Sequence, residues 1–296
     1  MHRLRRRRPH MSLAFFTTAA QIRQHTALLA TQARSLALVP TMGCLHRGHL
    51  ALVEAARAKA EVVALSIFIN PLQFGPKEDF GRYPRRLEED LKACEEAGVD
   101  WVYAPAAEEV YPPGFQTHVS CEALSQPLCG RSRPTHFQGV TTVVCKLFAL
   151  FRPRWAMFGE KDFQQLCLVR AMSRDLDLGV EVEAIPIIRE EDGLALSSRN
   201  VLLTPAERQQ ATALSRALFA ARQRCQQGER RAAVLLDEAN ACLLQAGVRV
   251  DYVDIVDEAT LQPVASIEAP NVRMLAAGFV GNTRLIDNLL LNGATP

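Results

Sequence analysis

Two histidines close the stretch Val39-Pro40-Thr41-Met42-Gly43-Cys44-Leu45-His46-Arg47-Gly48-His49. An apolar run, residues 36–39, leads into it, and residues 50–56, which have helical composition, follow it. The order strand, tight loop, helix places a helix N-terminus beside the carboxyl end of a strand, where free N–H groups and the helix dipole attract anions. Positions i and i+3 lie on one side of a helical turn, so both imidazoles can donate to phosphoryl oxygens, and can share negative charge when protonated. The stretch predicts a nucleotide site; two surface histidines at an ordinary helix start are the alternative.

Strands and helices alternate on either side of this stretch. Residues 61–69 are apolar almost throughout and rich in β-branched side chains, which is typical of a strand buried on both faces. The other predicted strands are 100–105, 155–158 and 178–187, and the predicted helices are 19–33, 84–98, 137–151 and one that begins near 163. This alternation predicts an α/β domain, a doubly wound parallel sheet over residues 12–186.

The pattern changes after residue 186. An acidic turn, residues 190–193, lies between two short apolar segments and indicates a small hairpin. Thr204-Pro205-Ala206-Glu207 is typical of a helix start, with Thr204 as N-cap, proline at the first position and Glu207 completing a capping box. Two long helices are expected, to about 227 and over 229–246, and strands over 250–256 and 272–277. Residues 187–296 are therefore predicted to form a smaller α+β C-terminal domain.

Composition indicates a soluble, cytoplasmic protein. No uninterrupted apolar segment approaches the roughly 20 residues that a membrane span needs. The eight cysteines form no Cys-x-x-Cys pair, so neither a zinc site nor a disulfide framework is indicated. There is no Gly-x-x-x-x-Gly-Lys-[Ser/Thr] loop, so phosphate binding would not be of the P-loop kind.

The first ten residues contain five arginines and no acid, so the formal net charge of +2 hides a charge of −3 over the rest of the chain. We expect residues 1–11 to be a disordered basic leader, with Met11 a candidate start. Binding of nucleic acid or an anionic membrane, or a targeting peptide, are the alternatives.

Polar residues also follow the other predicted strands. Asn70 and Gln73 follow residues 61–69; Lys161, Asp162 and Gln165 follow 155–158; Ser197, Ser198 and Arg199 stand in the predicted hairpin. Each has an ordinary interpretation as a solvated charge, a turn residue or a loop cap. Because the carboxyl ends of parallel strands share one edge of a sheet, we expect these groups to converge as a phosphate clamp beside neutral amides suited to a hydroxylated organic acid. The irregular segment 111–136 is expected to be a mobile lid.

Six segments, in this order along nearly the whole chain from Met11, closely resemble the pantothenate synthetase family. They are Pro40-Thr41-Met42-Gly43 with His46-x-Gly48-His49, Ile69-Asn70-Pro71-Leu72-Gln73-Phe74-Gly75, His136-Phe137-Gln138-Gly139-Val140, Gly159-Glu160-Lys161-Asp162 with Gln165, Ser197-Ser198-Arg199-Asn200, and a tail with Asp251-Tyr252-Val253 and Thr283-Arg284-Leu285-Ile286-Asp287. The resemblance implies a Rossmann-like nucleotidylyltransferase fold, a homodimer, and ATP-dependent condensation of pantoate with β-alanine through pantoyl adenylate, releasing AMP and pyrophosphate. ATP with Mg²⁺ would be the nucleotide substrate, with no tightly bound prosthetic group, no metal site of the protein's own, and no nucleic-acid or membrane partner.

The resemblance also implies residue roles. His46 and His49 would bind ATP phosphates, His49 as proton donor, and Lys161 would hold phosphate through adenylation. Gln73 and Gln165 would hold pantoate, Gln73 also facing β-alanine, with Asn70 nearby. The residues that would line ATP are Met42, Gly43, Cys44, Leu45, His46, Arg47, Gly48, His49, Gly159, Glu160, Lys161, Asp162, Ile188, Leu196, Ser197, Ser198 and Arg199.

Some positions depart from the family pattern. Leu196 stands where methionine is common, Thr135 replaces a usual glycine, and Lys77 a common asparagine. Asp90 and Glu89 are candidate magnesium neighbours or part of a solvated helix face. Another adenylyl- or cytidylyltransferase is the alternative function; a phosphorylated acceptor would call for extra Lys or Arg in place of Gln73 and Gln165. A nucleotide or RNA binder using the leader is a third hypothesis.

Overall fold

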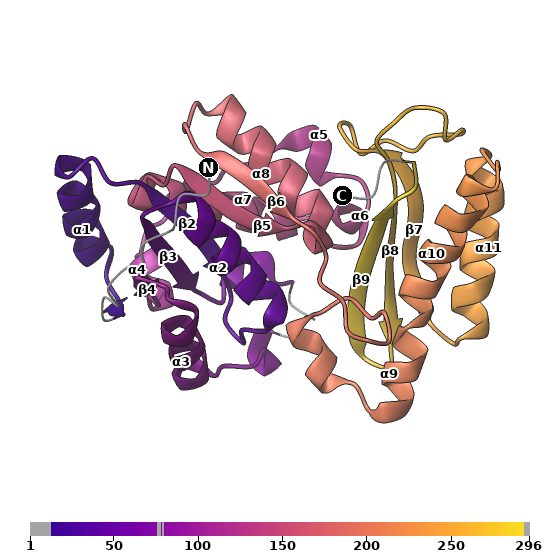
Figure 1. The fold of residues 1–296 in the computed structure, drawn as a ribbon, viewed down its shortest axis with the longest axis horizontal. Helices are drawn as coiled ribbons and strands as arrows, with labels where there is room; N and C mark the ends of the chain where they lie inside the picture. The colour runs from indigo at the N-terminus through magenta and orange to yellow at the C-terminus, as the bar shows by residue number, and fades with distance from the viewer. Residues whose placement is uncertain (1–12, 76–77, 79, 293–296) are drawn as a thin grey trace, which may run out of the picture.

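The computed structural model describes residues 13–292 except 76, 77 and 79. The predictions for the leader and for Lys77 lie outside the described residues. Six parallel strands form the larger sheet in the order β1-β4-β3-β2-β5-β6 (Figure 1). They are β1 (Ala14–Phe16), β2 (Leu36–Thr41), β3 (Val62–Ile67), β4 (Trp101–Tyr103), β5 (Trp155–Gly159) and β6 (Glu181–Ile185). The doubly wound parallel sheet is confirmed, and β1, a three-residue edge strand, was not predicted.

Helices cover both faces of this sheet, because β2 and β3 are apolar on both sides and must be buried on both. One face packs against α1 (Ala19–Thr31), α7 (His136–Phe151) and α8 (Phe163–Asp175). The other face packs against α2 (Arg47–Lys59) and α3 (Leu87–Ala97). The strand order reverses between β2 and β5, so the crevice at the carboxyl ends of these two strands is the expected ligand site of such a sheet.

Short elements fill the loops at this edge. The predicted irregular segment 111–136 holds two single-turn helices and ends at the first residue of α7. The short elements of this domain are η1 (Pro71–Gln73), η2 (Phe80–Arg82), α4 (Ala107–Val110), α5 (Glu122–Ser125), α6 (Cys129–Ser132) and η3 (Glu160–Asp162). Thr135 has φ −97°, so no left-handed backbone calls for glycine at that position. That this segment is a mobile lid stays a prediction.

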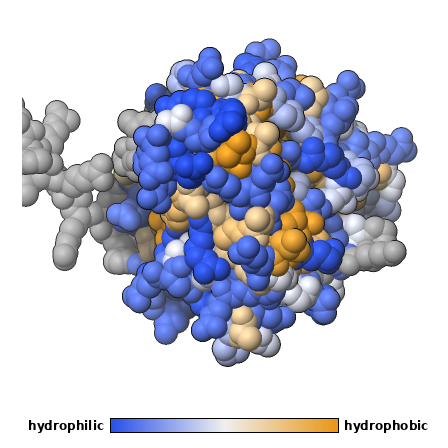
Figure 2. Space-filling view, turned by 90° about the vertical axis from the view of Figure 1, so that its right-hand side faces the viewer, coloured by the Kyte–Doolittle hydropathy of each residue, from blue (hydrophilic) through white to orange (hydrophobic). Residues whose placement is uncertain are grey.

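The C-terminal part contains an antiparallel sheet of order β7-β8-β9 covered by helices, as predicted for an α+β unit (Figure 1). Its elements are η4 (Ser198–Leu202), α9 (Pro205–Ala211), α10 (Ala213–Gln226), α11 (Ala232–Gln245), β7 (Arg249–Asp257), β8 (Val272–Val280) and β9 (Thr283–Leu290). The capping box is confirmed, with Thr204 N donating to Glu207 Oε2 at 2.8 Å and Glu207 N to Thr204 Oγ1 at 3.3 Å. The outer face of this part is mostly hydrophilic with scattered hydrophobic patches (Figure 2), as expected where amphipathic helices cover a sheet.

The C-terminal part differs from the prediction in two details, one interrupted helix and one unpredicted strand. The long helix expected to run to about 227 is interrupted at Thr212, which separates α9 from α10. The strand β9 was not predicted. The predicted small hairpin is present: Arg189 and Ala195 form an antiparallel bridge, Glu190 N donates to the Leu194 carbonyl at 2.8 Å, and Leu196 N donates to the Ile188 carbonyl at 2.9 Å. Among the described residues no helix is long and apolar enough to cross a membrane.

Candidate active site

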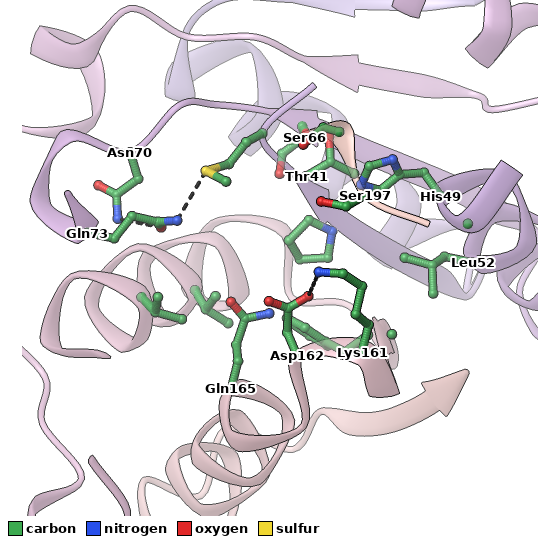
Figure 3. A pocket seen from close by; sticks show the side chains of 18 of the residues that line it. Thr41, His49, Leu52, Ser66, Asn70, Gln73, Lys161, Asp162, Gln165 and Ser197 are labelled. Carbon is green, nitrogen blue, oxygen red and sulfur yellow. Dashed lines mark hydrogen bonds and ion pairs between the residues drawn. The ribbon is translucent and has the colours of Figure 1, made fainter. Parts of the chain in front are cut away.

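A cavity of about 240 Å³ lies at the predicted edge, where β2, β3 and β5 end. A larger groove of about 880 Å³ lies between α1 and α7, but none of the predicted site residues lines it. Lys161, Asp162 and Gln165 lie on one side of the cavity and face His49 and Ser197 across it (Figure 3). The predicted residues that line the cavity are Met42, His46, Gly48, His49, Asn70, Gln73, Gly159, Lys161, Asp162, Gln165, Ile188, Leu196, Ser197, Ser198 and Arg199.

The loop between β2 and α2 is held by a buried carboxylate. Asp90 of α3, 3% exposed, accepts from Cys44 N at 2.8 Å and Leu45 N at 2.7 Å. Gly43 has φ +84°, and a Cβ there would lie 2.9 Å from Asp90 Oδ2, so this turn requires glycine. Burial raises the pKa of Asp90, although the two loop N–H groups act to lower it. Asp90 therefore holds the loop and is not a solvated residue, whereas Glu89 is exposed and pairs with Arg86 at 3.2 Å. That these two carboxylates neighbour magnesium stays a prediction.

The two histidines of this loop present the same ring nitrogen to the cavity. Gly48 N donates to His46 Nδ1 at 3.1 Å, and His46 N donates to His49 Nδ1 at 3.3 Å. A backbone N–H can only donate, so each neutral imidazole carries its proton on Nε2. Burial, with Lys161 nearby, lowers the pKa of His46 to about 4; burial, with His46 and Lys161, lowers the pKa of His49 to about 3. Both rings are neutral hydrogen-bond donors at pH 7, so protonated imidazoles are not the source of positive charge in the free site.

Lys161 supplies positive charge opposite the histidines. Its side chain is 20% exposed, and Nζ lies 3.6 Å from Asp162 Oδ2. Burial would raise the pKa of Asp162, but Lys161, followed by Arg199, outweighs burial and lowers the pKa. The backbone of η3 is fixed from the C-terminal sheet, because Asn288 Nδ2 of β9 donates to the carbonyls of Glu160 and Lys161, both at 2.9 Å.

The two glutamines differ in how they are held. The Gln165 side chain makes no hydrogen bond to the described part of the chain, and its amide points into the cavity (Figure 3). The Gln73 backbone carbonyl accepts from Arg133 at 3.2 Å and from His136 Nδ1 at 2.8 Å. The Gln73 amide is bound by Asn70, whose side chain is fully buried. The buried Asn70 side chain therefore lines the cavity and holds the Gln73 side chain, and it is not exposed for direct contact with a substrate.

The serine loop closes the far side of the cavity. Ser197 Oγ caps η4 by accepting from Arg199 N at 3.2 Å. Ser198 Oγ shares a hydrogen bond of 3.0 Å with the Tyr83 hydroxyl, and the Arg199 guanidinium lies 5.6 Å from the centre of the Tyr83 ring. Tyr83 thus contacts Ser198 and Arg199, two residues predicted to line ATP. The sequence alone did not indicate this role for Tyr83.

Five residues predicted to line ATP do not line this cavity. Arg47 points to the surface, 67% exposed, and pairs with Glu190 at 3.1 Å. The Glu160 carboxylate lies 3.6 Å from Arg273. The other three are Gly43, Cys44 and Leu45.

Several lining residues were not predicted. Arg133 and His136 lie in the polar run of the expected lid, and this position could have indicated that they line the site. Nothing in the sequence around Ser66 or Tyr83 indicated that these residues line the cavity. The Ser66 hydroxyl is buried without a hydrogen-bond partner in the described chain. No group of three or more His, Cys, Asp or Glu side chains within the described ranges could hold a metal ion.

Comparison with known proteins agrees with this geometry. A family model described as pantoate-β-alanine ligase matches residues 14–290. The chain is 52% identical to a pantothenate synthetase of Myxococcus xanthus, covering 96% of this chain and 98% of the relative. It is 50% identical to one of Moorella thermoacetica, covering 93% of this chain and 97% of the relative.

Solved structures give the same result. A pantothenate synthetase of Thermus thermophilus matches with a TM-score of 0.90 at 48% identity, covering 95% of this chain and 100% of that one. A pantoate-β-alanine ligase of Francisella tularensis, complexed with β-γ ATP and β-alanine, matches with a TM-score of 0.79 at 29% identity, covering 96% and 100% of the two chains.

Proposed function

The chain belongs to the pantoate-β-alanine ligase family, and from this premise we propose which residues carry out the ATP-dependent condensation of pantoate with β-alanine that it catalyses. One observation supports the assignment most strongly: two neutral imidazole donors and one lysine face two amides in a single cavity at the switch point of the sheet. This membership favours the condensation over the alternative of a transferase acting on a phosphorylated acceptor.

The first step activates a poor acyl donor. A pantoate carboxylate oxygen attacks the α-phosphorus of ATP, an O–P bond forms, the bond to the β-phosphate oxygen breaks, and pyrophosphate leaves. His46 and His49 donate Nε2–H to the phosphoryl oxygens, and Lys161 places its ammonium beside the charge that develops on them. Gln73 and Gln165 hold pantoate, with Asn70 behind Gln73.

The second step forms the amide. The amine of β-alanine attacks the carbonyl of pantoyl adenylate, a C–N bond forms, the C–O bond to AMP breaks, and the amine loses a proton. The protein forms no covalent bond in either step, so positioning and charge stabilisation provide the rate.

Magnesium would be supplied with the nucleotide, as MgATP, and would offset the charge of its phosphates. Among the described lining residues Asp162 is the only carboxylate, and Mg²⁺ is commonly bound by one or two carboxylates together with substrate phosphates. The donor set therefore suits a metal carried mainly by ATP, and Asp162 is the described lining residue that would hold it.

Pyrophosphate release tests these roles. With MgATP and pantoate alone, the wild type should release about one pyrophosphate per site and turn over only when β-alanine is added. Lys161→Ala should lose on the order of 10²-fold in rate, whereas Lys92→Ala, a matched exposed lysine on α3, should not. Pyrophosphate release that does not depend on pantoate would refute the proposed function. A fully active Lys161→Ala would refute the role of Lys161 in stabilising the phosphate charge.

Three broader expectations are part of the proposal. Residues 12–186 and 187–296 would be the two domains, since one hydrophobic cluster draws only on residues 194–291; limited proteolysis should cut between them. The resemblance supports a homodimer, which sedimentation velocity would detect. Eight cysteines, all free, favour the cytoplasm, which fractionation of cells would test.

A further inference from the structure

We propose that Tyr111 is a positioning residue of the pantoate site: through Asn70 it fixes the Gln73 amide with its nitrogen toward the substrate, so that Gln73 recognises an oxygen atom. The inference rests on the proposed role of Gln73 and goes beyond it, because it assigns both the residue that orients Gln73 and the kind of atom that Gln73 binds.

The orientation of the Asn70 amide is determined by backbone groups. Leu72 N, which can only donate, lies 3.3 Å from Oδ1, and the Gly139 carbonyl, which can only accept, lies 3.0 Å from Nδ2. Exchanging the two ends of the amide would place donor against donor and acceptor against acceptor in a fully buried position. Asn70 therefore has one stable orientation.

That orientation is passed to Gln73. The second N–H of Asn70 Nδ2 donates to Gln73 Oε1 at 3.1 Å, which leaves Gln73 Nε2 toward the cavity. In the free site Nε2 donates to Met42 Sδ at 3.1 Å (Figure 3). A thioether is a weak acceptor, so a substrate oxygen displaces it readily. The reverse orientation would present Oε1 to the cavity and favour an ammonium group, such as that of β-alanine.

Tyr111 completes the arrangement. Its hydroxyl donates to Asn70 Oδ1 at 2.8 Å and occupies the second acceptor position of that oxygen. The ring is held between Phe68, with ring centroids 6.1 Å apart, and Phe115, at 4.9 Å. Burial raises the pKa of Tyr111, so the hydroxyl stays protonated and remains a donor.

The test measures kinetics of pyrophosphate release for Tyr111→Phe, with Tyr103→Phe as the matched control. Tyr103 is another buried tyrosine, and its hydroxyl makes no hydrogen bond to the described part of the chain. Tyr111→Phe should raise the KM for pantoate about 5- to 10-fold, the effect of one hydrogen bond lost from a buried network, and leave the KM for ATP within about twofold. In a Gln73→Ala background Tyr111→Phe should have no further effect on pantoate.

A second variant tests the orientation directly. Gln73→Glu keeps an acceptor for Asn70 but replaces the donor that faces the cavity by an oxygen, so its KM for pantoate should be at least as high as that of Gln73→Ala. A KM for pantoate near the wild-type value in Gln73→Glu, effects of Tyr111→Phe equal to those of Tyr103→Phe, or full additivity with Gln73→Ala would each overturn the inference. A wild type without pantoate-dependent release would instead refute the function itself.

Discussion

Asp90→Asn is expected to weaken ATP binding through the backbone of the histidine loop. The carboxylate accepts two backbone N–H groups, from Cys44 at 2.8 Å and Leu45 at 2.7 Å, in a position that is 3% exposed. An asparagine keeps one acceptor oxygen and turns its NH₂ group against the second N–H.

The size of the effect follows from this geometry. Losing a hydrogen bond to a charged group costs about 1.5–3 kcal/mol, and the orphaned donor adds to it. The neutral amide is easier to bury than the carboxylate, which offsets part of the cost. A net of about 2 kcal/mol against the loop conformation that places His46 corresponds to a rise of about 30-fold in the KM for ATP.

The assay titrates MgATP at saturating pantoate and β-alanine. Glu89→Gln is the control, because it makes the same change of charge one residue away on an exposed face. The dependence on free Mg²⁺ should be unchanged in Asp90→Asn, since the structure assigns Asp90 to the loop. A KM for ATP equal to that of Glu89→Gln would refute the reasoning, and a specific shift in the Mg²⁺ requirement would support Asp90 as a metal neighbour.

Two further predictions concern stability. Burial lowers the pKa values of His46, His49 and His136 to about 4, 3 and 4, from an ordinary 6.5. As the pH falls below 6.5 the unfolded chain binds protons that the folded chain does not, so the free energy of unfolding should fall by about 3 kcal/mol between pH 6.5 and 5.5, about 1 kcal/mol for each histidine. Urea unfolding measures this: His136→Gln should reduce the loss by about a third, and equal stability at the two pH values would contradict it. Gly139→Ala would place a Cβ 2.4 Å from the Leu72 carbonyl oxygen, so we expect a loss of about 2 kcal/mol and a higher KM for pantoate. Gly81→Ala, where a Cβ meets no atom within 4 Å, is its control, and equal melting temperatures for the two variants would count against the close contact.

Features encoded by neighbouring residues were predictable from the sequence. The strand-loop-helix order around His46 and His49, the apolar strands and the Thr204 capping box are local patterns, and all are confirmed. The groups that orient the site residues were not predictable. Asp90 meets Cys44 across 46 residues of sequence, and Tyr111 meets Asn70 across 41. An aspartate on a charged helix and a tyrosine in a proline-rich loop have ordinary local explanations, and only the packed fold brings them to the loops they hold.

Asn288, near the C-terminal end of the chain, contacts the backbone of η3, which carries Lys161. This contact links activity to the order in which the ribosome synthesises the chain. Every described residue that lines the proposed ATP cavity precedes position 200, yet the carbonyls of Glu160 and Lys161 receive their partner from β9, near the end of the chain. Asn288 Oδ1 itself accepts a hydrogen bond from Arg273 Nη1 of β8 at 2.5 Å. The contact to residues 160 and 161 therefore depends on both β8 and β9. A nascent chain can complete the parallel sheet long before this support exists. We expect such an intermediate to leave the loop that holds Lys161 unfixed and to consume no ATP until β9 has been synthesised and paired.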